Sequence, residues 1–197
     1  NTFEQLIERC EIVFKRLIAA GLKMSGKKTK IGLTEVKYLG YICNREGIHM
    51  NPDKIKAVQE WPRPLNAHQL RQFLGLTGYL RRFIKNYANI AHPLTQQQSG
   101  PKEKPILWDE KSINAFQQLK EALIDPNQVL AYPDFSANAE PFIIETDSSK
   151  LSEGAILKQN QNGHERVIAY ASRSFPLSEQ QWGITQLEAH CIWWALT

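Results

Sequence analysis

Cysteine is scarce in this sequence, and long apolar runs are absent. The three cysteines, Cys10, Cys43 and Cys191, are scattered and form no Cys-x-x-Cys pair. This spacing argues against a disulfide scaffold or a zinc module and suits a reducing compartment, so we expect the protein in the cytoplasm or the nucleus. No stretch approaches the roughly 18 consecutive apolar residues of a membrane-spanning helix, and we expect no signal peptide at the N-terminus.

Sequence motifs of several large enzyme classes are missing as well. The chain has no glycine-rich phosphate loop, no Gly-x-Ser-x-Gly elbow and no dinucleotide-binding fingerprint. Its histidines have no metal-ligand spacing with one another or with cysteine, and its tryptophans are expected to anchor the core. With 42% hydrophobic and 22% charged residues among 197, the composition is that of a globular protein of one or two domains.

Charge is distributed unevenly along the chain. Residues 1–100 carry 16 basic and 7 acidic side chains, a net charge of +9, whereas residues 101–197 carry 8 basic and 13 acidic, a net charge of −5. Such a split suggests two modules, of which the first binds a polyanion and the second holds cations. The alternative is that the two halves merely differ in their solvated surfaces.

Helical and strand-like patterns alternate along the chain. Thr2 and Gln5 have the spacing of a capping box, and Gly21 is expected to end the helix that follows. Asn51 and Asp109 are expected to cap later helices, and another helix is expected to start at Asn66. Gly75 and Gly78 are expected to interrupt that helix, and Asn160-Gln-Asn-Gly163 is expected to form a hairpin turn. Helices are expected over residues 3–20, 52–61, 66–84, 87–94, 110–123 and 178–196. Strands are expected at Ile31, Leu33, 36–42, 48–50, 142–146, 154–158 and 166–171. Residues 96–105 are expected to form a linker.

Short motifs occur in a fixed order over nearly the whole chain. They include Glu35-Val-Lys-Tyr-Leu-Gly-Tyr41, Leu70-Arg-Gln-Phe-Leu-Gly-Leu-Thr-Gly-Tyr79, Tyr132-Pro-Asp-Phe135, Thr146-Asp-Ser-Ser149 and Ile168-Ala-Tyr-Ala-Ser-Arg173. In this order they resemble the pol polyprotein of Ty3/gypsy-type LTR retrotransposons, such as the transposon pol proteins of arthropods.

The resemblance implies an α+β chain made of palm-end helix and β-hairpins, a helical thumb, and a partial RNase H-like α/β domain, an antiparallel β-meander followed by a helix. The implied boundaries are 1–50 for the C-terminal part of a reverse-transcriptase palm and 51–98 for the thumb. A linker and connecting helix would occupy 99–140, and the N-terminal part of the RNase H-like domain 141–197.

The polymerase active site is expected to be absent from this chain. In the family, the polymerase metals bind an aromatic-x-Asp-Asp hairpin that would lie just before residue 1. The chain contains no Asp-Asp pair, and two-metal phosphoryl transfer requires clustered carboxylates. We therefore expect no DNA synthesis from this chain alone.

Two carboxylates match RNase H positions by resemblance. Asp147 and Glu188 match the first two catalytic ligands of two Mg²⁺ ions, and a further Asp is expected beyond the end of the chain, so the site is expected to be incomplete. Glu153 stands where the family usually has an apolar residue, and Gln186 where it often has Glu. Neither of these two is a ligand position. In retroviruses the corresponding segment is a non-catalytic connection.

The basic half carries the expected nucleic-acid contacts. By resemblance, Leu39, Gly40 and Tyr41 form the primer grip, and the glycine-broken helices after residue 66 form the thumb that follows the minor groove of the template–primer. Guanidinium groups pair bidentately with phosphate, and glycine permits close approach. The expected thumb contacts are Arg71, Gly75, Arg81, Arg82 and Lys85, whereas the core is expected to hold Phe73, Leu74, Leu80 and Phe83.

These features predict a fragment of a retrotransposon reverse transcriptase–RNase H that binds RNA–DNA or DNA duplexes without sequence specificity. One alternative is a Mg²⁺-dependent RNase H endonuclease, completed by the remainder of the pol polyprotein or by a partner chain. The other is a domesticated or decayed retroelement product whose thumb-like helices bind protein.

Overall fold

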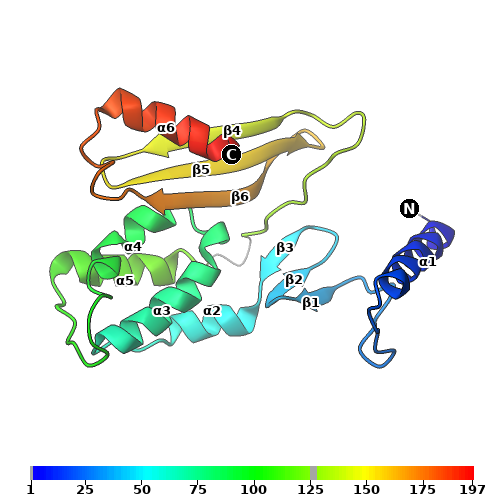
Figure 1. Ribbon diagram of the computed structural model, residues 1–197, viewed down its shortest axis with the longest axis horizontal. Coiled ribbons are helices and arrows are strands. Elements are labelled where there is room, and N and C mark those ends of the chain that lie inside the picture. The colour runs from blue at the N-terminus through cyan, green and yellow to red at the C-terminus, as the bar shows by residue number, and fades with distance from the viewer. Residues whose placement is uncertain (1, 125–127) are drawn as a thin grey trace. The chain divides into compact units, whose positions relative to one another are not determined.

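The computed structural model describes residues 2–124 and 128–197, so residues 125–127 of the expected connecting segment lie outside the described residues. The chain divides into two compact units, Asn1–Val36 and Lys37–Thr197. Figure 1 shows the elements of each unit.

The first unit contains one helix, α1 (Phe3–Ala19). The predicted capping box is confirmed, because Thr2 Oγ1 accepts from the Gln5 backbone N–H while the Gln5 side chain accepts from that of Thr2. Gly21, at φ 71°, follows the C-cap as predicted. The strands expected at Ile31 and Leu33 are wrong: Gly32, at φ 71°, interrupts the extended backbone between them.

The second unit begins with a small sheet of order β1-β2-β3, formed by β1 (Val36–Tyr38), β2 (Tyr41–Cys43) and β3 (Ile48–Met50). The expected single strand over 36–42 is instead a hairpin. Leu39 and Gly40 have φ values of 46° and 74°, and two successive positive values define a type I′ turn. β3 is followed by helices α2 (Pro52–Gln59), α3 (Ala67–Tyr79), α4 (Tyr87–Thr95) and α5 (Glu110–Glu121).

Local capping places three of these helices as predicted. Asn51, Asn66 and Asp109 each accept a backbone N–H at the start of α2, α3 and α5. The predicted interruption at Gly75 and Gly78 is wrong, since α3 continues through both. An interior glycine costs roughly 1 kcal/mol, and the buried face of α3 outweighs that cost.

A single hydrophobic core joins these helices. Phe73, Leu74, Leu80 and Phe83 are buried in it, as predicted. Helix α5 contributes Phe116 and Leu119 to the same core, and the expected linker is fastened to α3 by backbone bonds from residues 67 and 68 to residues 104 and 102. The boundaries at 50, 98 and 140 stay a prediction.

The chain ends in a second antiparallel sheet, of order β4-β5-β6, and one helix. The strands are β4 (Phe142–Ser148), β5 (Ser152–Gln161) and β6 (His164–Ser174), and the hairpin predicted between the last two turns at Asn162 and Gly163. Helix α6 (Ile184–Leu196) lies on one side of this sheet and α4 on the other (Figure 1). The expected helix start at Ser178 is wrong, because α6 begins after Gly183, whose N–H binds the Gln186 side chain.

The tryptophans do not behave alike. Trp61 and Trp108 pack against the core, as predicted. Trp182 and Trp193 are 37% and 60% exposed, so the expectation that they anchor the core is wrong. Both lie against His190 instead.

Candidate nucleic-acid interface and carboxylate site

Asp147 and Glu188 line one surface pocket of about 240 Å³. Asp147 lies near the end of β4 and Glu188 in the first half of α6, and both side chains are exposed. The rest of the lining is Thr146, Ser148, Cys191 and Ile192. Folding therefore brings together two predicted ligands that are 41 residues apart in the sequence.

The pocket depends on how α6 lies on the sheet. The buried residues of α6 are Leu187 and Cys191. The Cys191 thiol donates to the backbone oxygens of Asp147 and Gly154, each at 3.4 Å. Burial raises the pKa of this thiol and keeps it protonated, so it remains a donor. A side chain of α6 thus binds the main chain at the position of the candidate ligand.

The two carboxylates have the chemistry of a Mg²⁺ site. Mg²⁺ takes oxygen ligands, keeps several waters and often binds through one or two carboxylates. Within residues 2–124 and 128–197, no cluster of three His, Cys, Asp or Glu side chains could hold a metal ion. The pair therefore fits one hydrated cation, whereas two ions about 3.5–4 Å apart would need further ligands.

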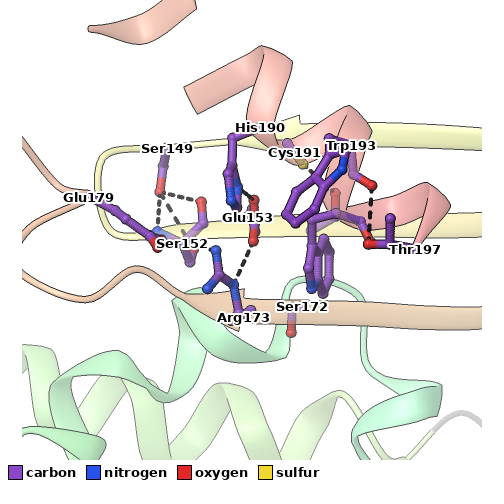
Figure 2. Close-up of polar contacts among 12 residues, drawn as sticks. Ser149, Ser152, Glu153, Ser172, Arg173, Glu179, His190, Cys191, Trp193 and Thr197 are labelled. Atoms are coloured by element: carbon purple, nitrogen blue, oxygen red, sulfur yellow. Dashed lines mark hydrogen bonds and ion pairs between the residues drawn. The ribbon is translucent and has the colours of Figure 1, made fainter. Parts of the chain in front are cut away.

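Glu153 lies in the same region. The sequence indicated only that a charged residue stands there where the family usually has an apolar one. The structure buries its side chain completely, at 0% exposure. Its Oε1 accepts from Arg173 Nε at 2.6 Å, and its Oε2 lies 2.9 Å from His190 Nδ1 (Figure 2). The signal available in the sequence was a charged residue in a strand position that is otherwise apolar.

The predicted primer-grip residues lie at the β1–β2 hairpin. Leu39 is at the turn and 69% exposed. Tyr41 stacks on Tyr79 at the end of α3, with ring centroids 4.9 Å apart, and its hydroxyl donates to the Tyr79 backbone oxygen at 2.9 Å. Burial, followed by the interaction with the Tyr79 side chain, raises the pKa of Tyr41 to about 12. A Cβ on Gly40 would lie 2.8 Å from the Tyr79 hydroxyl, so the turn sits directly on the helix.

The predicted basic contacts fall into two groups. Arg71 donates to the backbone oxygens of Gln98 and Gly100, and Arg81 donates to that of Ser172 on β6. These two guanidinium groups therefore bind the protein itself. Arg82 lies over the Tyr41 ring, 5.8 Å from its centroid, and Lys85 is exposed in the turn before α4.

Gly75 lies on the exposed side of α3. A Cβ there would meet nothing within 4 Å among the described residues. It therefore leaves an open surface on the helix.

The helices of the described chain include none that is long and apolar enough to span a membrane.

Comparisons with known proteins agree with this arrangement. The family model described as "RNase H-like domain found in reverse transcriptase" matches residues 108–197. The Pol polyproteins of transposons opus and gypsy from Drosophila melanogaster are each 36% identical, over 194 and 199 residues that cover 94% and 96% of this chain. The chain spans 19% of the length of each.

A solved structure shares the fold over the full length. It is the foamy viral protease-reverse transcriptase in complex with RNA/DNA hybrid, which is 24% identical with a TM-score of 0.75. The match covers 100% of this chain and 26% of that one. The α+β arrangement is thus that of a known reverse transcriptase structure.

Proposed function

Because this chain belongs to the reverse transcriptase and RNase H-like part of retroelement Pol polyproteins, we propose that it binds a template–primer or RNA–DNA duplex without sequence specificity. The observation that carries the proposal is the net charge of +9 on residues 1–100, together with Arg82 and Lys85, which lie close in sequence to the Tyr79 that anchors the β1–β2 turn. Phosphate contacts of this kind position a protein on a duplex and carry no sequence information.

The proposal assigns a role to each part of the chain. Residues 1–50 are the end of the palm, 51–98 the thumb, 99–140 the connecting segment and 141–197 the RNase H-like domain. Leu39, Gly40 and Tyr41 position the primer end, and Gly75 allows the duplex to approach α3. The three free thiols suit a reducing compartment, the cytoplasm or the nucleus.

We further propose that Asp147 and Glu188 hold Mg²⁺ for cleavage of the RNA strand. Their shared pocket supports this assignment. Bound Mg²⁺ would polarise the scissile phosphate and lower the pKa of a water ligand. The two carboxylates of this chain orient the cation, and the remainder of the pol polyprotein supplies the other ligands. With that remainder present, cutting should depend on Mg²⁺ and be lost in Asp147→Asn.

Salt-dependent duplex binding tests the interface. Fluorescence anisotropy with an RNA–DNA hybrid and a DNA duplex should give a slope of log K against log salt of roughly −2, as expected for Arg82 and Lys85, the two predicted contacts that do not bind the protein's own backbone. An affinity that does not change with salt, or no binding to any duplex at low salt, would contradict the proposal. Co-purification of protein without nucleic acid would favour the interaction-module alternative.

Variants separate phosphate contacts from internal contacts. Lys85→Ala should weaken binding to every duplex and reduce the slope by about 1. Lys111→Ala, which removes an exposed lysine from α5 in the acidic half, is the matched control and should leave the slope unchanged. Arg81→Ala should lower the free energy of unfolding and change the slope little, because its guanidinium binds the Ser172 backbone oxygen.

A further inference from the structure

The buried carboxylate of Glu153 connects three elements of the RNase H-like part. Glu153 lies on β5, Arg173 on β6 and His190 on α6. Figure 2 shows His190 pointing from α6 toward Glu153, with Arg173 approaching from the neighbouring strand. Arg173 also donates to Glu179 at 2.9 Å, in the segment before α6. We call Glu153, Arg173, Glu179 and His190 the α6 clamp.

Both oxygens of Glu153 are engaged inside the protein. One binds Arg173 Nε at 2.6 Å and the other His190 Nδ1 at 2.9 Å, and the side chain is shielded from solvent. A buried carboxylate is tolerated when hydrogen bonds satisfy its oxygens, and removing one partner is costly. Glu153 is therefore suited to hold other groups in place rather than to bind a metal ion.

Aromatic side chains fix the His190 ring from several sides. The ring centroids of Trp182 and Trp193 lie 5.4 Å from that of His190, and the centroid of Phe175 lies 6.1 Å away. Packing on this scale restricts the ring to one orientation, with Nδ1 toward Glu153. His190 therefore links α6 to Glu153 on β5.

Helix α6 has little apolar burial to hold it otherwise. Its buried side chains are Leu187 and Cys191, whereas Ile192, Trp193 and Leu196 are more than half exposed. Two buried residues about one turn apart give the helix a small apolar contact with the sheet. The polar contact of His190 and the thiol contact of Cys191 define its register.

We propose that Glu153 and His190 are positioning residues that hold α6 in register, so that Glu188 stays in the pocket with Asp147. The role of the pocket rests on the function proposed above, whereas the attachment of α6 can be measured without a metal ion. His190 follows Glu188 by two residues on the same helix, so any shift of His190 moves Glu188 with it.

The reactivity of Cys191 measures the attachment of α6. Cys191 lies on the face of α6 that packs on the sheet and is 1% exposed, so a thiol reagent reaches it faster when the helix detaches. In a Cys10→Ser/Cys43→Ser background, Glu153→Leu and His190→Leu should each raise the labelling rate by tenfold or more. His190→Asn should keep the rate low, because its amide can donate to Glu153 in place of Nδ1. Glu165→Leu, which removes an exposed carboxylate from β6, is the matched control.

The coupling of the two residues is measured in the double variant. Glu153→Leu/His190→Leu should raise the rate by much less than the product of the single effects, because the two side chains interact directly. Thermal unfolding of each variant shows that the fold is retained at the labelling temperature. Labelling rates equal to that of the parent in both single variants would overturn the clamp.

The position of Glu188 is tested by Mn²⁺ binding at the pocket, which is followed by the Mn²⁺-induced relaxation of nearby nuclei. Mn²⁺ binding that is lost in Asp147→Asn reports the carboxylate pair. Glu153→Leu should weaken it at least threefold, and Glu165→Leu should not. Faster Cys191 labelling with unchanged Mn²⁺ affinity would overturn the positioning role. A parent chain with no Mn²⁺ binding at the pocket would overturn the metal site, while the labelling rates still decide the clamp.

Discussion

Arginines of the thumb-like block that look equivalent in the sequence have different partners in the fold. Arg71 and Arg81 donate to main-chain oxygens of distant segments. Arg82 lies on an aromatic ring instead. A guanidinium hydrogen-bonds to carbonyl and phosphate oxygens through its N–H groups and stacks on aromatic rings through its face, so residue type alone does not select the partner. Chain packing makes that choice, and it removes Arg81 from the group of simple phosphate contacts.

Tyr41 provides a pH-dependent test of the hairpin anchor. Its pKa is raised to about 12, mainly by burial and then by the contact with Tyr79. Because the folded pKa lies above the unfolded value near 10, this stabilisation is complete below pH 10 and is lost as pH rises toward 12. Absorbance titration at alkaline pH should lose one late-titrating tyrosine in Tyr41→Phe, whereas Tyr87, Tyr132 and Tyr170, whose pKa values burial also raises, should still titrate late.

Two further results would bear on this prediction. Tyr38→Phe, at an exposed tyrosine of the same hairpin, should leave the late titration in place. Tyr41→Phe should also lower the free energy of unfolding by about 1 kcal/mol at neutral pH, the usual net value of one hydrogen bond. An unchanged number of late-titrating tyrosines in Tyr41→Phe would show that the hydroxyl is not held against α3.

At the scale of elements, most helices are capped by their own neighbours in sequence, and α4 is not. Its N-cap residue, Asn86, has φ 55° and makes no side-chain cap bond within the described residues. The Ala88 N–H instead donates at 2.9 Å to the side-chain oxygen of Ser172 on β6, which lies 84 residues further along the chain. The start of α4 is thus specified by the second sheet.

Ser172→Ala tests this long-range cap. The Ala88 N–H would be left buried without a partner, so the free energy of unfolding should fall by about 1–2 kcal/mol. Urea denaturation measures the change. Ser174→Ala, at an exposed position two residues along β6, should change it by less than about 0.5 kcal/mol. Equal effects of the two substitutions would show that Ser172 does not cap α4.

At the scale of the whole molecule, contacts between the helical core and the second sheet hold the second unit together. The Ala131 N–H donates to the Val167 backbone oxygen at 2.7 Å, and Val167 and Tyr170 pack against the core. Gly154 on β5 faces Asn86 before α4, and a Cβ there would lie 2.6 Å from Asn86 Oδ1. The sheet and helices therefore meet at a contact that has no room for an added methyl group.

Gly154→Ala tests how closely the two layers are packed. The added methyl group would force the Asn86 side-chain amide to rotate away, and overpacking costs about 1–3 kcal/mol, here at the lower end because the displaced atom is the end of a side chain. The midpoint of thermal unfolding should fall. Gly75→Ala is the control, because its helical site has open space and loses an interior glycine. That substitution should stabilise the protein by roughly 0.5–1 kcal/mol. Destabilisation by both would contradict the prediction.

The sequence alone predicted the features that depend on residues a few positions apart. The capping box at Thr2, the caps at Asn51, Asn66 and Asp109, and the Asn162-Gly163 hairpin all follow from local hydrogen bonds and backbone preferences. Ordered motifs along the chain identified the family. The local errors, at the 36–42 run and at Ser178, came from patterns compatible with two structures, where small differences in turn geometry decide.

Only the tertiary structure decided which distant groups meet. It placed Asp147 and Glu188 in one pocket, tied Arg81 to β6 and buried Glu153 between Arg173 and His190. No local pattern encodes these contacts, because they join residues separated by 20 to 91 positions. Their energies depend on burial, which exists only once the chain has folded. The resemblance indicated Asp147 and Glu188 beforehand, whereas the only sign of the Glu153 contacts was a charged residue where the family usually has an apolar one.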